Sequence, residues 1–235
     1  RIAHNLFENI PSSALRIEGN NHIIELNVIR NVVRESDDQG GLDMFGNPLY
    51  RGVVIRWNRW SDIGGGTEHG AAGVRLDDMI SGVAVYGNVF ERCGAVHFGG
   101  AQIHGGKENL VEGNLFIDCL AGLSFSRWGE RRWLESIERF LPQANGPAYL
   151  SRYPELADLK ANADVNFICR NVFARCGSTF LRDGQVQKTA LNTASGEPLE
   201  TQVVPGERFP RDLAMLKPLF IEPIPLDEMG PYESN

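Results

Sequence analysis

Six segments of the chain repeat one pattern of apolar and polar positions: an asparagine, two apolar residues, two variable residues and a third apolar residue. The asparagines of the pattern are Asn5, Asn27, Asn58, Asn88, Asn114 and Asn171. Three positions before each asparagine stands a β-branched aliphatic residue, in order Ile2, Ile24, Ile55, Val85, Val111 and Ile168. Only Arg59 breaks an apolar position of the pattern. Columns that align over so many copies indicate a repeated structural unit.

The repeat predicts an all-β fold, a right-handed parallel β-helix of about six coils. Each coil would consist of a short β-branched strand, a polar corner and another short strand. Successive coils would pair in parallel about 4.8 Å apart, so that equivalent apolar residues form inward columns. Asparagine suits the corner because it tolerates left-handed backbone and can bond to the same amide one coil away. A leucine-rich repeat would need a leucine consensus and a constant period, and the asparagine spacings of 22, 31, 30, 26 and 57 residues are not constant.

The longest spacing predicts an insertion at about 127–165. Within it, residues 130–140 carry apolar side chains at the spacing of one helical face. We expect Pro142 and Gly146 to end this helix and a second short helix to follow at about 154–161. A helical insertion can cover the side of a solenoid or wall a substrate cleft, and the two roles are compatible.

Both ends of the chain also carry a pattern. Ile2 and Asn5 are already in register with the repeat, so the first coil would expose apolar core and a sheet edge. We therefore expect the single β-helix domain, residues 1–235, to be the C-terminal fragment of a longer protein. Six prolines between 205 and 231 predict an extended capping tail over 200–235, whose segment 220–226 would lie across the last coil.

Composition and charge narrow the classes of partner. The net charge of −7 over 235 residues disfavours binding to nucleic acid or an anionic membrane, and no apolar run is long enough to span a bilayer. It also disfavours a highly anionic polysaccharide, unless a local basic patch overrides the net charge. Four cysteines make no disulfide scaffold, and Cys93, Cys119 and Cys176 share an inward column as buried thiols. We expect a monomer without metal or cofactor.

A second column consists of an apolar residue followed by a polar one. Its members are Ile17-Glu18, Leu42-Asp43, Leu76-Asp77, Ile103-His104, Phe125-Ser126 and Leu181-Arg182. Because alternate residues of a strand face opposite sides, Glu18, Asp43, Asp77 and His104 are predicted to stack on one outer face, with neighbours about 5 Å apart at the backbone.

The predicted stack supplies carboxylates for catalysis. Asp43 and Asp77 would be neighbours beside His104, with Asp78 on the following turn. Carboxyl groups about 5 Å apart suit a retaining glycosidase, and a separation of about 6.5–9.5 Å suits an inverting one. Crowding also separates the pKa values of such groups. Asp37 and Asp38 are a turn pair that could supply the second carboxylate.

The density of polar residues distinguishes this region from an ordinary solvated face. Within two consecutive coils lie His69, Arg75, Asp77, Asp78, His104 and Lys107. Glycines interrupt them at 64–66, 99–100 and 105–106, which favours close approach by a ligand. Trp128, at the start of the insertion, suits either stacking against a sugar face or plain packing.

At these residues the chain resembles a family of known proteins. The motifs are Tyr50-Arg51-Gly52, His69-Gly70-Ala71-Ala72-Gly73, Arg75-Leu76-Asp77-Asp78, Gln102-Ile103-His104-Gly105-Gly106-Lys107 and the closing stretch 223–230. They resemble the bacterial carbohydrate-active β-helix proteins with the pectin lyase-like fold, and most of all the glycoside hydrolase family 141-like group. That group contains a fucosidase and a xylanase, and an aspartate pair is implicated in its catalysis.

The resemblance implies a secreted or periplasmic protein that acts on carbohydrate. The aspartate pair would correspond to Asp77 or Asp78 together with Asp43 or the 37–38 pair. The first hypothesis is a glycoside hydrolase acting on a plant or microbial polysaccharide. Its aspartates would be the catalytic groups, with sugar contacts from His69, Arg75, His104, Lys107 and Trp128.

Two other functions stay open at this point. A polysaccharide lyase would use Arg75 or Lys107 as its base, with Ca²⁺ neutralising the uronate carboxylate. A non-catalytic carbohydrate-binding or adhesin solenoid would need only the binding surface, because a fold does not fix a function.

Overall fold

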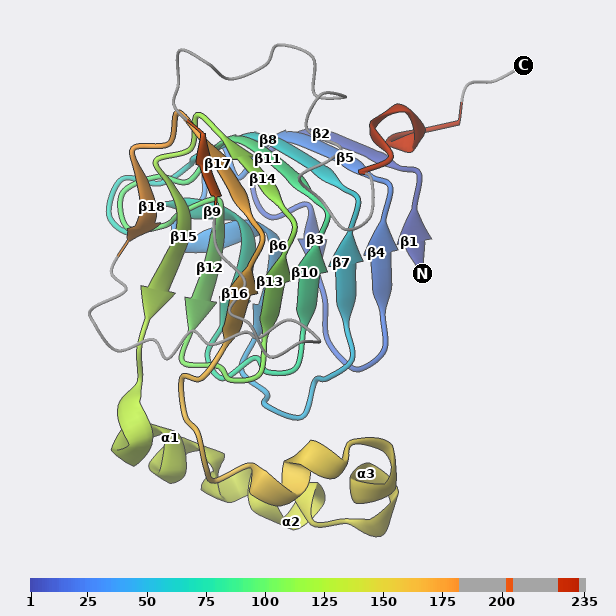
Figure 1. Cartoon of the computed structure of the whole chain (residues 1–235), viewed down its shortest axis with the longest axis vertical. Coiled ribbons are helices and arrows are strands. Elements are labelled where there is room, and N and C mark those ends of the chain that lie inside the picture. The colour runs from blue at the N-terminus through green and yellow to red at the C-terminus, as the bar shows by residue number, and fades with distance from the viewer. Residues whose placement is uncertain (182–201, 205–223, 233–235) are drawn as a thin grey trace.

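Three parallel sheets run side by side along the molecule and form the predicted parallel β-helix (Figure 1). The computed structural model describes residues 1–181, 202–204 and 224–232. Each of six coils contributes one strand to each sheet, and neighbouring strands of a sheet come from successive coils. No helix among these residues is long and apolar enough to cross a membrane.

The strands of each sheet follow in chain order along the axis. The first sheet consists of β1 (Ile2–Ala3), β4 (Ile23–Glu25), β7 (Val54–Arg56), β10 (Ala84–Tyr86), β13 (Leu110–Glu112) and β16 (Phe167–Cys169). The second consists of β2 (Leu6–Ile10), β5 (Val28–Val32), β8 (Arg59–Ile63), β11 (Val89–Cys93), β14 (Leu115–Ile117), β17 (Val172–Ala174) and β19 (Gln202–Val204). The third consists of β3 (Leu15–Arg16), β6 (Gln39–Phe45), β9 (Ala71–Asp77), β12 (Ala101–His104), β15 (Ala121–Ser126) and β18 (Ser178–Leu181).

The asparagine column is a continuous hydrogen-bond ladder between the first two sheets. At Asn88, the side-chain oxygen accepts the backbone N–H and the amide N–H of Asn58, at 3.0 and 3.1 Å. The Asn88 amide nitrogen in turn donates to Asn114 Oδ1 at 3.0 Å and to the carbonyl of Ile55 at 2.9 Å. The same pattern links all six asparagines of the repeat. The ladder therefore fixes which coil positions lie above one another.

The corner differs from the prediction in one respect. The left-handed residue is the one before each asparagine, with φ between 52° and 63°: His4, Leu26, Trp57, Gly87, Gly113 and Arg170. The preceding residue bends the chain, and the asparagine side chain is left to satisfy buried backbone groups. A shorter ladder, absent from the prediction, joins Asn109 Nδ2 to Asn166 Oδ1 at 3.0 Å.

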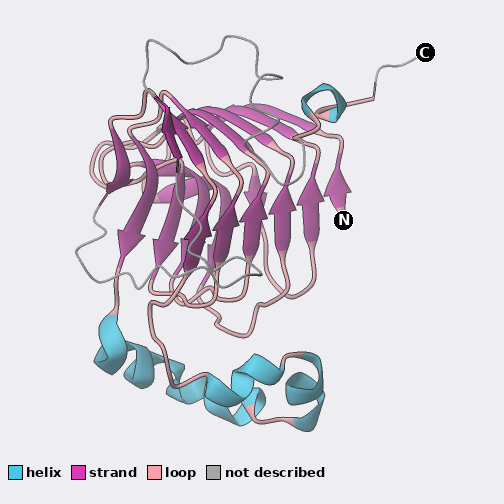
Figure 2. Ribbon diagram, in the orientation of Figure 1, coloured by secondary structure: helices cyan, strands magenta, loops and turns pink. Residues whose placement is uncertain are grey.

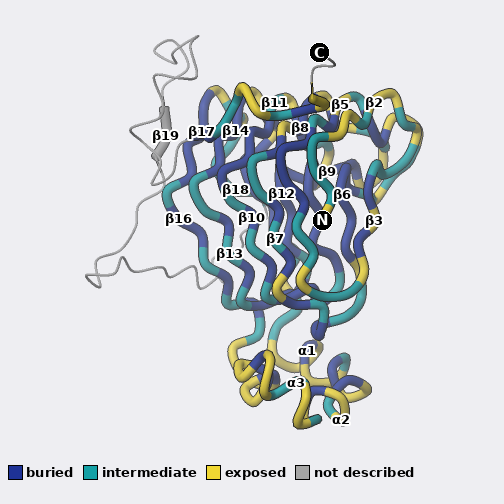
Figure 3. The backbone as a smooth tube through the Cα atoms, turned by 90° about the vertical axis from the view of Figure 1, so that its right-hand side faces the viewer, coloured by how far each residue is buried: buried dark blue, intermediate teal, exposed yellow. Residues whose placement is uncertain are grey.

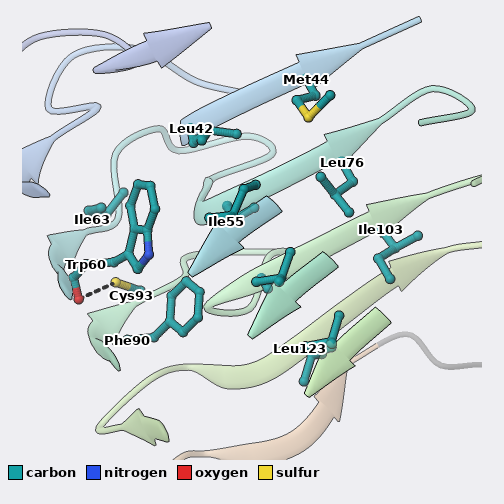
Figure 4. Packing of buried hydrophobic residues seen from close by; sticks show 14 of the residues in the cluster. Leu42, Met44, Ile55, Trp60, Ile63, Leu76, Phe90, Cys93, Ile103 and Leu123 are labelled. Atoms are coloured by element: carbon teal, nitrogen blue, oxygen red, sulfur yellow. Dashed lines mark hydrogen bonds between the residues drawn. The ribbon is translucent and has the colours of Figure 1, made fainter. Parts of the chain in front are cut away.

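Inward columns fill the interior (Figure 4). Trp60, Phe90, Phe116 and Phe173 stack with centroid separations of 6.1, 4.8 and 5.1 Å. Facing them in the third sheet is a glycine column, Gly41, Gly73, Gly100 and Gly122. A Cβ on Gly73 or Gly100 would lie 2.8 Å from the ring of Phe90 or Phe116. Glycine is needed here because a ring occupies the place of a side chain.

Other glycines also serve coil packing, which corrects their interpretation as marks of ligand approach. A Cβ on Gly65 would overlap the carbonyl of Val33, and one on Gly106 would overlap the carbonyl of Ile80. A Cβ on Gly99 would lie 2.8 Å from the backbone of the next coil. Gly65, Gly99 and Gly106 are thus explained by backbone contacts between coils, and Gly100 by the aromatic stack. The cysteine column is confirmed as free thiols, of which Cys93 and Cys119 are buried and Cys176 is half-buried.

A helical insertion lies along one side of the solenoid, below the strands in the view of Figure 2. It contains α1 (Gly129–Ile137), the 3-10 turn η1 (Glu138–Phe140), α2 (Leu141–Ala144), α3 (Pro147–Arg152) and the 3-10 turn η2 (Pro154–Asp158). Pro142 does not end the first helix; it lies in the first turn of α2, where no N–H bond is lost. The expected second helix is the short η2, and α3 was not predicted.

The insertion has its own apolar core, which also includes residues from the coils. Trp133, Ile137 and Phe140 pack against Leu49 and Met79, which lie in loops of the coils. The burial along the tube changes from the mostly buried coils to helices with one buried face (Figure 3).

Two buried cations join the coils to the insertion. Arg51 pairs with Glu155 at 3.1 Å, and Lys107 Nζ donates to the carbonyls of Asp158 and Ala161 at 2.8 and 2.6 Å. Because these groups are buried, the insertion is held in a defined orientation.

The described part of the tail lies on the outer face of the second sheet. Ile224 packs against Val89, Leu115 and Val172, and η5 (Leu226–Glu228) follows. Tyr232 stacks on His4 of the first coil with the ring centroids 4.0 Å apart. Residues 224–232 therefore run toward the first coil and not across the last one, and the rest of the predicted segment, 220–223, lies outside the described residues.

Replacing Asn88 by alanine should destabilise the protein by about 2–4 kcal/mol, because several buried donors and acceptors lose their partners. Chemical denaturation, monitored by circular dichroism, measures this change. Asn145→Ala, at an exposed position, is the control and should change stability by less than about 0.5 kcal/mol. Equal effects of the two substitutions would contradict a structural ladder.

Candidate functional site

The polar residues of the third sheet face outward, but their register differs from the prediction. Asp43 lies opposite Arg75, and Asp77 lies opposite Phe45. Figure 4 shows the same register from the inner side, where Met44 and not Leu42 is in line with Leu76. Asp43 and Asp77 are therefore diagonal neighbours, about 8 Å apart at Cα by strand geometry, and not direct ones.

The slip has a physical reason. A shift of two residues leaves every side chain on the same face, so alternation of apolar and polar residues cannot detect it. A similar shift moves Glu18 out of line with Asp43, because Arg16 is the residue opposite Asp43. Between β9, β12 and β15 the predicted register is confirmed, because Asp77, His104 and Ser126 lie in line on successive coils. Leu181 lies opposite Ser124, and Arg182 is outside the described residues.

Arg75 is the centre of this outer face. Its Nη2 lies 2.9 Å from both Asp38 Oδ1 and Asp77 Oδ2, and its Nη1 lies 3.9 Å from Asp43 Oδ1. Its guanidinium also stacks over Phe98 at 5.3 Å. The side chain is only 7% exposed. Arg75 is therefore placed to hold carboxylates and not to contact substrate.

Asp77, Asp78 and His104 form a compact cluster at the end of β9. His104 Nδ1 lies 2.7 Å from Asp77 Oδ1 and 3.4 Å from Asp78 Oδ1. Consecutive residues of a strand point to opposite faces, yet one oxygen of each aspartate and a ring nitrogen of His104 all lie within 4.8 Å of one another. The reason is the backbone, since Asp78 and Met79 both have positive φ, 39° and 71°.

Such conformations are costly for non-glycine residues. At this turn they bring two acids to one side and direct Met79 into the core of the insertion. The three side chains of the cluster also have the ligand types of a divalent cation site.

Two of the acids have pKa values shifted upward. Burial raises the pKa of Asp43 to about 6, opposed by Arg75 and supported by the charge of Asp77. Burial also raises the pKa of Asp78, and the neighbouring charge of Asp77 adds to this effect while His104 opposes it. Carboxylic acids that keep a proton toward neutral pH can act as general acids.

A pocket of about 330 Å³ lies between the end of β6, the turn after β9 and helix α1. Its lining residues are Phe45, Gly46, Asp78, Met79, Trp128, Glu135, Ser136 and Arg139. Asp78 is the one member of the acidic cluster among them, and Glu135 contributes a second carboxylate from α1. The insertion therefore both covers part of the side of the solenoid and walls a pocket, which correspond to the two roles that its sequence left open.

Trp128 has little free ring surface. A Cβ on Gly105 would overlap the Trp128 ring, and the guanidinium of Arg132 lies 3.8 Å from the ring centroid. Two groups this close to one ring leave it packed and not free to stack on a sugar. Phe45, at 45% exposure, is the aromatic side chain open to the pocket. The sequence signal for Phe45 was available, since it occupies an outward position two residues after Asp43.

Two residues predicted to bind substrate lie elsewhere. Lys107 is fully buried and holds the insertion, so it is not accessible to a ligand. His69 precedes β9, whereas Asp77 ends it, and the strand between them is about 20 Å long. There His69 Nδ1 lies 3.3 Å from Asp37 Oδ2, and both join Glu68 in a separate exposed group with metal-ligand side chains.

Comparison with known proteins gave no match to the sequence among family models or curated proteins, and none to the fold among solved structures. The site is therefore interpreted from its own geometry.

The raised pKa of Asp43 predicts a pH dependence of stability. Its pKa rises from the usual 3.8 to about 6 on folding, so the native state binds this proton more tightly than the unfolded chain. The resulting stabilisation is fully present below pH 4 and is lost as the pH rises through 6. Relative to Asp43→Asn, the wild-type protein should lose about 2 kcal/mol of stability between pH 4 and pH 7.

Urea denaturation of both proteins across this range measures the difference. Asp62→Asn is the control of opposite sign, because the ion pair with Arg92 lowers the pKa of Asp62. If the free energies of unfolding of wild type and Asp43→Asn changed equally with pH, the raised pKa of Asp43 would be contradicted.

Proposed function

We propose that the protein is a glycoside hydrolase of the family 141-like kind that acts on a plant or microbial polysaccharide. The observation that carries the proposal is Asp78, an acid with a raised pKa at the wall of a pocket, with a carboxylate oxygen of Asp77 within 4.8 Å of its own. Paired carboxyl groups in different environments are the requirement of glycoside hydrolysis. Secretion or a periplasmic location is part of the same proposal.

In this mechanism Asp78 is the acid/base and Asp77 the nucleophile. Asp78 gives its proton to the glycosidic oxygen as the bond to the anomeric carbon breaks, and Asp77 bonds to that carbon. Water then adds its hydroxyl group to the carbon, releases Asp77 and returns a proton to Asp78. The short separation of the two carboxyl groups favours this retaining course, because an inverting pair needs room for a water between them.

The surrounding residues position this pair. Arg75 and His104 each contact one oxygen of Asp77 and orient it. Asp43 acts through Arg75, because it lies opposite Arg75 in the sheet, with Oδ1 3.9 Å from Arg75 Nη1, and is not part of the cluster around Asp78. Phe45 offers an apolar face on which a sugar ring can stack.

The lyase hypothesis has less support. Its two candidate bases are engaged elsewhere, since Arg75 pairs with carboxylates and Lys107 donates to two backbone carbonyls. A calcium-dependent product that absorbs ultraviolet light would identify a lyase. Sugar binding without turnover would instead identify a binding module, for which the pocket and Phe45 would suffice.

Asp78→Asn should reduce the release of reducing sugar from the substrate polysaccharide by about 10²–10⁴-fold, because the proton donor is lost. Asp77→Asn should have a comparable effect, and Asp43→Asn a smaller one through Arg75. Initial rates on a panel of plant and microbial polysaccharides provide the measurement.

Asp62→Asn, an aspartate on the second sheet, is the matched control and should retain wild-type rates. Thermal unfolding shows whether each variant is folded. Full activity in folded Asp78→Asn would refute the assignment of the acid.

A further inference from the structure

We propose that the pocket beside Asp78 recognises a carboxylate on its sugar, through Arg132 and Arg139 of the helical insertion. This inference rests on the proposed function and names the class of substrate, an oligosaccharide that contains an acidic sugar.

The two arginines share one face of the helical segment. Arg132, Ser136 and Arg139 are spaced four and three residues apart along α1 and η1, so their side chains lie on the same side. Ser136 and Arg139 line the pocket. Arg132 covers the ring of Trp128, which lines the pocket as well, and its charge acts on Asp78.

Neither guanidinium is neutralised. Within the described residues no carboxylate lies within ion-pair distance of Arg132 or Arg139; their recorded contacts are the rings of Trp128 and Phe140. Most other arginines of this acidic protein are paired. Among them, Arg30 pairs with Glu8, Arg59 with Glu91, Arg92 with Asp62, Arg127 with Asp164 and Arg175 with Asp118.

The acids of the pocket do not cancel this positive charge. Glu135 already has an ion-pair partner, Arg131, at 3.5 Å. Asp78 lies within ion-pair distance of His104, at 3.4 Å, and not of Arg132 or Arg139. The pocket is therefore lined by one unpaired guanidinium, that of Arg139, and by the hydroxyl of Ser136, and a second unpaired guanidinium, that of Arg132, lies beside it over Trp128.

A carboxylate fits these groups better than a neutral hydroxyl does. The planar guanidinium matches a carboxylate with two parallel N–H bonds, and charge-assisted hydrogen bonds are the stronger kind. The volume of about 330 Å³ is that of a small ligand site, and Phe45 faces it from the sheet side. A uronic acid residue combines the ring face and the carboxylate that this arrangement can bind.

Binding is measured with the Asp78→Asn variant of the 235-residue chain, so that turnover is suppressed. The probes are oligogalacturonides, oligomannuronates and glucuronoxylan oligosaccharides, each compared by calorimetry with the same oligosaccharide after reduction of its carboxyl groups to alcohols. At least one acidic probe should bind about tenfold or more tightly than its reduced form. Adding Arg132→Gln or Arg139→Gln should each remove most of that preference without weakening the binding of the reduced form.

Arg152→Gln is the control on the same insertion, in α3 and outside the pocket lining, and should keep the preference. Equal binding of every acidic probe and its reduced form would overturn the inference, as would a preference that survives both pocket substitutions. Tighter binding of a sulfated oligosaccharide, such as a carrageenan fragment, would overturn the assignment to a carboxylate.

The two proposals fail in different ways. Release of reducing sugar by the wild-type protein from neutral oligosaccharides only, with no preference for acidic probes, would leave the hydrolase standing and refute the carboxylate site. An acidic preference in Asp78→Asn together with no turnover of any probe by the wild type would support the carboxylate site and refute the hydrolase.

Discussion

The hydrogen-bond ladder of buried asparagines is the interaction on which the rest of the structure depends. Each side-chain amide bonds to the asparagine of the next coil and to backbone carbonyls that would otherwise be unpaired in the interior. A coil that slipped by one residue would lose these bonds and turn its apolar side chains outward. The aromatic stack and the facing glycines then become necessary, because coils about 4.8 Å apart bring identical positions into contact.

The same stacking creates the electrostatics of the candidate site. Acids from β6 and β9 come close on one face of the third sheet, and the buried Arg75 between them offsets part of their repulsion. Asp78 is not one of the acids paired with Arg75, because two successive residues with positive φ turn its side chain toward the pocket. It is the acid of the cluster that lines the pocket. The solenoid thus provides a scaffold, and a turn with two positive φ angles at its edge brings Asp78, the acid of the proposed mechanism, to the pocket.

The insertion gives the site its walls. Without α1 the cluster of Asp77, Asp78 and His104 would lie on an open face, whereas with it Asp78 borders a pocket. Buried cations at 51 and 107 fix the insertion on the coils, which explains why conspicuous basic residues can lie close to a site without belonging to it. In the proposal for an acidic sugar, the exposed Arg132 and Arg139 of the insertion are the groups that would bind its carboxylate.

The sequence by itself determined the coils, the asparagine and aliphatic columns, the thiol column and the place of the insertion. These features follow from side-chain periodicity and repeat spacing, which are local properties. Only the tertiary structure decided that Asp43 faces Arg75 and not Asp77, because a slip of two residues preserves the pattern of faces. It also decided the roles of Lys107, Trp128, Phe45 and Glu135, since burial and pocket lining depend on how a distant helical segment packs against the coils.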